Sequence, residues 1–266
     1  MSGNFIIDVN DEPAFVYTGG RPFDLSRPAI VFIHGAAMDH SVWVLPARYF
    51  ARHAYNVIAV DLPGHGRSGG TPLDSIEAMA DFIAALLDAL HIDKASLVGH
   101  SMGSLVAFDV ARRHATRVSA LALVGSALPM AVSDPLLNAS QQDSHDAIDM
   151  LTYWGYSRAA QLGGSETPGM WMAGGTLRLL ERAAPGVLHT DLSACNRYRI
   201  NAEQESPIDV PALMILGDKD MMTPPRNSGL LKSLLTNVRI EILKGSGHTL
   251  MAERADKMLD ALITIL

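Results

Sequence analysis

A Gly-x-Ser-x-Gly motif occupies residues 99–103, with Ser101 at its centre. The motif alone is weak, because glycine and serine are common residues, but here it follows an apolar run and opens a helical pattern. In that setting a sharp strand-to-helix turn raises a serine hydroxyl out of a sheet, and the glycines remove side chains that would collide in the turn. The start of a helix also presents free backbone N–H groups to a developing negative charge. We therefore predict that Ser101 is a nucleophile.

A serine hydroxyl is a poor nucleophile unless a base accepts its proton. The sequence offers 10 histidines, so their positions must decide between them. His248 lies in a glycine-containing loop shortly after the apolar run at residues 239–243, at the carboxyl end of the last predicted strand. A lone loop histidine is more often exposed and idle. If the apolar runs are parallel strands, however, His248 and Ser101 both follow the carboxyl end of a strand and so lie at the same edge of the sheet. This location favours His248 as the base.

The base in turn needs a carboxylate that holds its tautomer and stabilises the imidazolium. Asp218 and Asp220 directly follow another apolar run, at residues 212–216, and both could be surface acids of a turn. Ser, Asp, His is one of the chain orders in which a serine, its base and the orienting carboxylate occur, so we expect one of the two aspartates to orient His248. Since they stand two residues apart on a turn, they cannot both face the same imidazole.

These residues stand at the ends of short apolar runs that alternate with helical patterns. Most of the runs are continuous, which is typical of strands buried on both faces of a largely parallel sheet. A helix that Asp74 can cap, with Glu77 three residues on, lies between two runs, and another leads from Ser101 to His114. We predict an α/β fold with a doubly wound, mostly parallel sheet and flanking helices. The predicted strands are residues 29–33, 57–60, 95–99, 121–124, 212–216 and 239–243, preceded by an antiparallel pair at 5–9 and 14–18.

The alternation is interrupted at residues 128–206. This segment contains no convincing strand, but helical stretches occur around 144–156 and 176–184. We predict a helical cap inserted between a first part of the core, residues 1–127, and a second part, residues 207–266. Such a cap would cover the carboxyl ends of the strands, where open α/β sheets bind ligands.

The predicted cap is rich in methionine and tryptophan. Met130, Trp154 and Trp171 are candidates for the lining of a substrate pocket. The alternative is an ordinary helical layer in which these side chains are simply core, since burial is the default for such residues.

Five short motifs together resemble the serine-nucleophile branch of the α/β-hydrolase fold superfamily, over essentially the whole chain. Their order and spacing are far more specific than any one motif. They are FIHG (32–35), DLPGHGRS (61–68), GHSMG (99–103), GDKDMMTPP (217–225) and GSGHTLMAE (245–253). In such families the acid stands three residues after the glycine that ends its strand. The resemblance therefore implies that Asp220 is the acid, with Asp218 as its neighbour.

The resemblance also implies which backbone groups bind a developing oxyanion. They are the N–H of Ala36, directly after the His-Gly turn, and the N–H of Met102, directly after the nucleophile. Two preorganised donors are worth several kcal/mol, about 3–4 kcal/mol for one donor. By the same resemblance, His34, His65 and His100 are structural residues of their turns rather than bases.

The implied chemistry is acyl transfer to water. A carboxylic ester of a small to medium, largely apolar substrate would be cleaved through an acyl-enzyme on Ser101. Methionine and tryptophan side chains pack around hydrocarbon without satisfying charges, which favours an apolar acyl or alcohol group.

Several other functions share this machinery. The C–C bond hydrolases of ring-cleavage pathways carry Asn where this chain has His100, and a lactonase, thioesterase or perhydrolase would look much the same. An esterase acting on an acyl-carrier protein should show a basic patch, whereas no Lys or Arg occurs between Val118 and Ser157. The alternative without catalysis is a small-molecule receptor that retains the three residues.

Composition and charge narrow the possible partners. The chain of 266 residues has 21 Lys and Arg against 28 Asp and Glu, a formal net charge of −7. Since phosphate binding needs clustered Lys and Arg, this balance argues against a nucleic-acid surface. No stretch approaches 18 uninterrupted apolar residues, so we expect no membrane span. The first residues lack a positive leader and the single Cys195 cannot form an intramolecular disulfide, so we expect a cytoplasmic protein.

We expect no metal and no cofactor. His34, His40, His53 and His65 are dispersed, and neither an HExxH nor a CxxC pattern occurs. The expected partner is a small ester-like substrate, and the sequence leaves the oligomeric state open.

Overall fold

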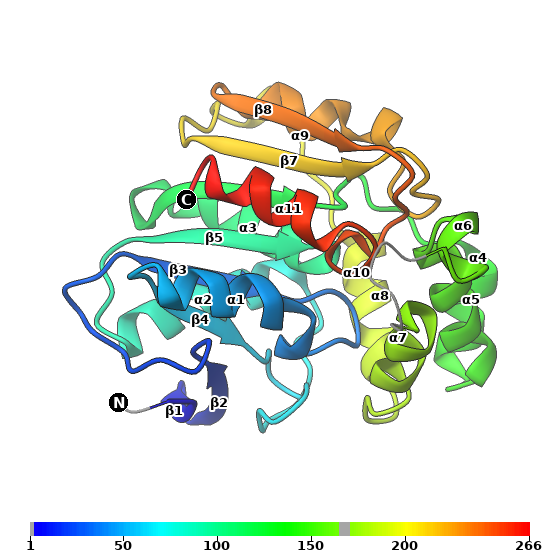
Figure 1. Cartoon of the computed structure of the whole chain (residues 1–266), viewed down its shortest axis with the longest axis horizontal. Coiled ribbons are helices and arrows are strands. Elements are labelled where there is room, and N and C mark those ends of the chain that lie inside the picture. Colours follow the sequence, from blue (N-terminus) through cyan, green and yellow to red (C-terminus); the bar gives the residue numbers. More distant parts are fainter. Residues whose placement is uncertain (1–2, 165–170) are drawn as a thin grey trace.

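The computed structural model describes residues 3–164 and 171–266. Its centre is an eight-stranded sheet in the order β1-β2-β4-β3-β5-β6-β7-β8 (Figure 1). Strands β3 to β8 are parallel, and the β1–β2 pair joins the sheet antiparallel to β4. The predicted doubly wound, mostly parallel sheet is confirmed. The strands are β1 (Phe5–Val9), β2 (Glu12–Tyr17), β3 (Ala29–Ile33), β4 (Asn56–Val60), β5 (Ala95–His100), β6 (Val118–Val124), β7 (Ala212–Gly217) and β8 (Val238–Leu243).

The flanking helices form two layers, because successive side chains of a strand point to opposite faces of the sheet. In β3, Val31 and Ile33 pack on one face while Ile30 and Phe32 pack on the other, all fully buried. Helices α2, α3 and α9 cover the first face, and α1, α10 and α11 pack on the second (Figure 1). These helices are α1 (Val44–Arg52), α2 (Ile76–Ala89), α3 (Met102–Arg113), α9 (Gly229–Leu234), α10 (Leu250–Glu253) and α11 (Ala255–Ile263), with 3-10 turns at His40–Trp43, Ala115–Arg117, Ala202–Gln204 and Pro225–Ser228.

Two predicted helix starts were wrong by one residue. The side chain of Ser75, rather than that of Asp74, caps α2 by accepting a hydrogen bond from the N–H of Ala78 at 3.3 Å. Ser75 has extended backbone and directly precedes the first helical residue, so its short side chain reaches the free N–H groups there. Ser101 likewise precedes α3 rather than opening it.

Strand β8 departs from the pattern of burial on both faces. It pairs only with β7 and forms one edge of the sheet. Its last residue, Leu243, is buried, whereas Ile242 is 48% exposed. Continuous burial therefore describes the interior strands and not this edge.

Between β6 and β7, a group of helices lies beyond the ends of the strands toward which the parallel arrows point (Figure 1). The predicted stretch at 144–156 corresponds to α5, and the stretch at 176–184 overlaps α7, which begins four residues earlier. Helices α4, α6 and α8 were not predicted. None of the helices in the described part of the chain is long and apolar enough to cross a bilayer. The group comprises α4 (Asp134–Gln141), α5 (His145–Gly155), α6 (Arg158–Gln161), α7 (Met172–Leu180) and α8 (Val187–Arg197).

The beginning of α3 lies directly against the backbone of the central strands. A Cβ atom on Gly103 would stand 2.3 Å from the carbonyl oxygen of Ile33 in β3. One on Gly99 would stand 2.0 Å from the carbonyl oxygen of Gly103. At both positions the obstructing atoms belong to the backbone, which cannot move aside as a flexible side chain can. Only glycine therefore permits this packing.

We predict that Gly103→Ala lowers the free energy of unfolding by about 1–3 kcal/mol, because α3 must move away from β3. Gly175→Ala is the matched control, since Gly175 lies in α7 with nothing within 4 Å of its Cβ position. In an exposed helix, alanine should be more stable than glycine by about 0.5–1 kcal/mol. Urea unfolding of both variants measures the difference. Equal stability of the two would contradict the close approach.

Candidate active site

Ser101 stands at the junction of β5 and α3 with a strained backbone. Its φ is 53° and its ψ is −118°, a region that residues with a Cβ rarely occupy. The N–H of Ser101 donates to the carbonyl of Val124 at 2.9 Å, and its own carbonyl accepts from the N–H of Ser104 at 2.8 Å. Bonds on both sides of the residue thus hold the conformation in place, as strained functional positions require.

His248 and Asp220 meet at the same edge of the sheet, although 28 residues separate them in the chain. His248 follows β8 and Asp220 follows β7, and Nδ1 of His248 lies 2.8 Å from Oδ2 of Asp220. Both side chains are almost fully buried. Asp218 points elsewhere, because its Oδ1 accepts a hydrogen bond from the N–H of Gly245 at 2.6 Å. The residue pattern alone left open whether Asp218 or Asp220 contacts the imidazole. In the structure, Asp220 contacts it.

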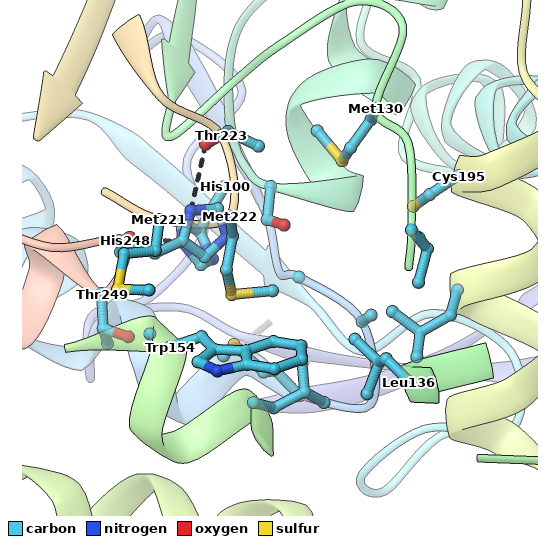
Figure 2. Close-up of a pocket in the computed structure, with 18 of the residues that line it drawn as sticks. His100, Met130, Leu136, Trp154, Cys195, Met221, Met222, Thr223, His248 and Thr249 are labelled. Carbon is cyan, nitrogen blue, oxygen red and sulfur yellow. Dashed lines mark hydrogen bonds between the residues drawn. The ribbon is translucent and has the colours of Figure 1, made fainter. Parts of the chain in front are cut away.

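Thr223 contacts both members of this pair, a role that was not predicted from the sequence. Its hydroxyl donates to Oδ2 of Asp220 at 2.7 Å. The same hydroxyl lies 3.1 Å from Nδ1 of His248 (Figure 2). The backbone N–H groups of Met222 and Thr223 both donate to Oδ1 of Asp220 at 2.8 Å. Both oxygens of the Asp220 carboxylate are therefore hydrogen-bonded, which fixes its orientation. The only signal in the sequence was the tight turn that begins at Asp220.

The electrostatics of this pair favour an ionised Asp220. Burial by itself raises the pKa of the carboxyl, but His248 and the hydrogen bonds from Thr223 outweigh it and lower the pKa of Asp220 to about 2. With the carboxylate accepting at Nδ1–H, the neutral imidazole carries its free lone pair on Nε2. This Nε2 is buried and has no hydrogen-bond partner among the described residues. It is therefore available to accept a proton from a hydroxyl group.

Two backbone N–H groups near Ser101 also lack partners within the described chain. In the turn after β3, the N–H of Ala37 donates to Asp191 and the N–H of Met38 to the carbonyl of Gly35, which leaves the N–H of Ala36. The N–H of Met102, in the first position of α3, has no partner inside the helix. The turn runs directly past the serine, since a Cβ on Gly35 would lie 3.4 Å from that of Ser101. Two free donors of this kind can stabilise an oxyanion.

The three histidines expected to be structural have specific partners. The ring of His34 accepts from the N–H of Leu62 at its Nε2, and its Nδ1 donates to the carbonyl of Gly35. Nε2 of His100 donates to the carbonyl of His248 at 3.0 Å. Burial is the main cause that lowers the pKa of His34 to about 4 and that of His100 to about 3, so both rings are neutral. His65 lies between the carbonyl of Pro63 and the carboxylate of Asp191.

Ser101 and His248 open into one cavity of about 150 Å³ beneath the helices that follow β6. Two of the candidate pocket residues, Met130 and Trp154, line it (Figure 2). Apart from histidine, no residue with a charged side chain occurs among the described residues that line it. The remaining walls are mostly apolar and include Met38, Leu136, Leu151, Leu180, Leu192, Cys195, Met221 and Met222.

The prediction that Trp171 lines this pocket was wrong. Trp171 is 70% exposed and borders a separate groove between α7 and the segment before α1. It directly precedes α7, and its indole lies against Gly174, where a Cβ would stand 2.0 Å from the ring. The missing side chain of Gly174 thus lets the indole rest on the outer surface of the helix.

One cluster of described residues has the spacing of a metal site: Asp39, His40 and Asp61, with ligand atoms within 4.8 Å of one another. These atoms already satisfy each other and their neighbours. Nδ1 of His40 donates to Asp61 at 2.8 Å, and Asp39 forms an ion pair with Arg182 at 2.7 Å. Asp61 also accepts from the N–H of Arg67. The cluster is therefore explained by its role in holding the loops after β3 and β4.

We predict that Asp220→Asn lowers stability in a pH-dependent way. The carboxyl has a pKa of about 2 in the folded chain against an ordinary value of 3.8. A lowered pKa contributes stability that is fully present above the ordinary value and is lost as the pH falls through the folded value. The difference in unfolding free energy from wild type should be about 2 kcal/mol at pH 6 and shrink as the pH falls from about 4 toward 2.

Urea unfolding at a series of pH values measures this difference. Asp218→Asn is the control, because Asp218 lies on the same turn but does not contact His248. A deficit in Asp220→Asn that is the same at every pH would contradict an ionised, imidazole-paired carboxylate.

Comparisons with known proteins agree with this architecture. A family model described as the α/β hydrolase fold matches residues 28–255. A pimeloyl-[acyl-carrier protein] methyl ester esterase of Neisseria meningitidis is 30% identical over 238 residues, covering 85% of this chain and 73% of the relative. An (E)-2-((N-methylformamido)methylene)succinate hydrolase of Acinetobacter baylyi is 26% identical over 198 residues, or 72% of each chain.

Among solved structures, an enol-lactonase from Burkholderia xenovorans has a TM-score of 0.85 at 22% identity, with 98% of each chain covered. This likeness concerns the fold alone. The family model, by contrast, matches most of the chain, including Ser101, Asp220 and His248. On this match, the chain belongs to the α/β-hydrolase fold superfamily, a family of hydrolases.

Proposed function

We propose that this protein is a serine hydrolase that cleaves carboxylic esters with an uncharged, largely apolar acyl group. The observation that carries the proposal is a shared cavity. Ser101, on its strained turn, and the free Nε2 side of the His248–Asp220 pair both border one cavity with mostly apolar walls. A nucleophile, its base and a place for hydrocarbon thus occur together.

The proposed reaction has two halves. In the first, Nε2 of His248 accepts the proton of the Ser101 hydroxyl as Oγ attacks the ester carbonyl, and the same proton then passes to the leaving alcohol. In the second, His248 takes a proton from water, which attacks the acyl-enzyme and releases the acid. Asp220 holds Nδ1–H throughout and stabilises the imidazolium. In both tetrahedral intermediates, the N–H groups of Ala36 and Met102 bind the oxyanion, with about 3–4 kcal/mol for one donor.

The walls of the cavity support an uncharged acyl group. A carboxylate on the acyl chain would lose its water there and meet no Arg or Lys among the described lining residues. Burying an unpaired charge is strongly unfavourable. Methionine and tryptophan walls, as at Met130 and Trp154, instead suit hydrocarbon. We also assign the segment at 128–206 the role of a cap between core parts 1–127 and 207–266, since this segment supplies more than half of the described residues that line the cavity.

The esterase of Neisseria meningitidis supports ester cleavage within this range of activities. A lactone is an internal ester and would use the same groups. The C–C bond hydrolases remain the second enzymatic alternative, and a receptor that binds without turnover is the third. Activity assays distinguish these possibilities.

We predict Ser101-dependent hydrolysis of p-nitrophenyl esters in a series from acetyl to dodecanoyl. Ser101→Ala should lower kcat by at least about 10⁴-fold, because the acyl-enzyme can no longer form. A matched pair tests the walls: p-nitrophenyl pentanoate against mono-p-nitrophenyl glutarate, which has the same number of acyl carbons and a carboxylate. The neutral ester should have the higher kcat/KM by at least about 10-fold.

Equal rates for the two five-carbon esters would contradict the proposed substrate class. Turnover that survives in Ser101→Ala would contradict the nucleophile. A folded protein that is inactive on the whole series would contradict ester hydrolysis, and carbon–carbon substrates would be tested next, followed by ligand binding.

We also predict that Asp220→Asn and Asp218→Asn differ in rate. Loss of the Asp220 carboxylate frees the imidazole to adopt the wrong tautomer, and kcat should fall by about 10³- to 10⁴-fold. Asp218→Asn should stay within about 3-fold of wild type, since Asp218 bonds to the backbone of Gly245 instead. Steady-state rates on one ester decide between them, and a larger loss in Asp218→Asn would overturn the assignment.

A further inference from the structure

Helix α8 contacts the turn after β3 through one buried carboxylate. Asp191 is fully buried, and its Oδ2 accepts a hydrogen bond from the N–H of Ala37 at 2.8 Å. The same oxygen lies 2.8 Å from Nε2 of His65, in the loop after β4. In the chain, 154 residues separate Asp191 from Ala37, and 126 separate it from His65. A single oxygen atom thus connects the helical segment to two loops of the core.

The turn needs an anchor because its backbone is strained. Ala37 has a φ of 54°, a left-handed conformation that is unfavourable for a residue with a Cβ. The bond from Ala37 to Asp191 and the bond from Met38 to the carbonyl of Gly35 hold it. With these N–H groups engaged, the adjoining N–H of Ala36, beside Ser101, is left without a partner among the described residues. The carboxylate therefore restricts rotation of the peptide next to this donor.

Asp191 is itself held by His65. Nδ1 of His65 lies 3.0 Å from the carbonyl oxygen of Pro63 and Nε2 lies 2.8 Å from Oδ2 of Asp191, so each ring nitrogen faces an acceptor. Burial alone lowers the pKa of His65, but the charge of Asp191 and its hydrogen bond outweigh burial and raise the pKa. A buried ion pair is weak evidence for a contribution to stability, because desolvation offsets the attraction between the charges. Its geometric effect on the turn is therefore the more informative property.

The helix that carries Asp191 also lines the cavity. Leu192 and Cys195, which follow Asp191 in α8, both border the cavity that Ser101 faces. Movement of α8 would therefore reach the walls of the cavity and the turn together.

We propose that Asp191 is a positioning residue for the reaction: through the N–H of Ala37, it holds the turn whose Ala36 amide binds the oxyanion. The inference rests on the proposed role of Ser101 as nucleophile.

The test compares Asp191→Ala, which removes the anchor, with Asp191→Asn, which keeps an oxygen within reach of the N–H of Ala37. Asp191→Ala should lower kcat by about 10- to 100-fold with KM changed by less than about 3-fold, because the donor acts in the transition state. Asp191→Asn should recover most of the rate. Asp109→Asn is the control, since Asp109 is equally buried but bonds to Arg112, Arg113 and Tyr198 rather than to the turn after β3.

A pair of ligands separates an effect on the oxyanion from an effect on the cavity. An alkyl trifluoromethyl ketone forms a bond between its carbonyl carbon and Oγ of Ser101, the hydroxyl proton passes to His248, and the carbonyl oxygen becomes an oxyanion. The matching trifluoromethyl carbinol fills the same space but cannot form this adduct. Asp191→Ala should weaken binding of the ketone by at least about 10-fold and binding of the carbinol by less than about 2-fold.

If Asp191→Ala weakened binding of both ligands equally, or of neither, the positioning role of Asp191 would be overturned. An Asp109→Asn variant with the same kcat loss and ligand profile as Asp191→Ala would also overturn it. If Ser101→Ala bound the ketone as tightly as wild type does, the proposed nucleophile would fail first, and the inference with it. Should Asp191→Ala fail to fold, Asp191→Ser replaces it, since a serine side chain is too short to reach Ala37.

Discussion

The site depends on one local constraint: the chain must turn from β5 into α3 within a single residue, with Ser101 at a positive φ. A conformation of this kind costs about 1–3 kcal/mol and persists only where surrounding structure holds it. Gly99 and Gly103 supply the room, because α3 starts against the backbone of β3 and β5. The carbonyl of Val124 holds the serine N–H from β6. The tight packing of the central strands thus fixes the direction of one hydroxyl group.

The sheet could be predicted from the sequence because each strand is marked by a pattern within its own few residues. Strands buried on both faces read as continuous apolar runs, and each predicted run overlaps an observed strand. The edge strand β8 departs from this pattern, since one neighbour leaves alternate side chains in solvent. Helices α4, α6 and α8 were also missed. Helix α8, for example, buries the carboxylate of Asp191 toward the core, and a buried charge breaks the apolar periodicity that reveals a helix.

The residues of the candidate site were predictable where a motif fixes their position at the end of a strand, as for Ser101, Asp220 and His248. Residues defined by distant partners were not. Asp191 reaches its two loops across more than a hundred residues of sequence, and no local pattern marks such a contact. Trp171, in contrast, was predicted to line the pocket but lies on the surface. A bulky apolar side chain can lie there when a neighbouring glycine, here Gly174, leaves room for it. The cavity therefore had to be seen in three dimensions.

If Ser101 is the nucleophile, an acyl-enzyme forms on its hydroxyl, and trapping that intermediate shows this role directly. Wild-type protein would be mixed with p-nitrophenyl butyrate, quenched in acid within milliseconds, and examined by mass spectrometry with peptide mapping. This role of Ser101 predicts a mass increase of one butyryl group on the peptide that contains Ser101, and none in Ser101→Ala. Sustained release of p-nitrophenol with an acyl group on another residue, or with Ser101→Ala as active as wild type, would contradict it.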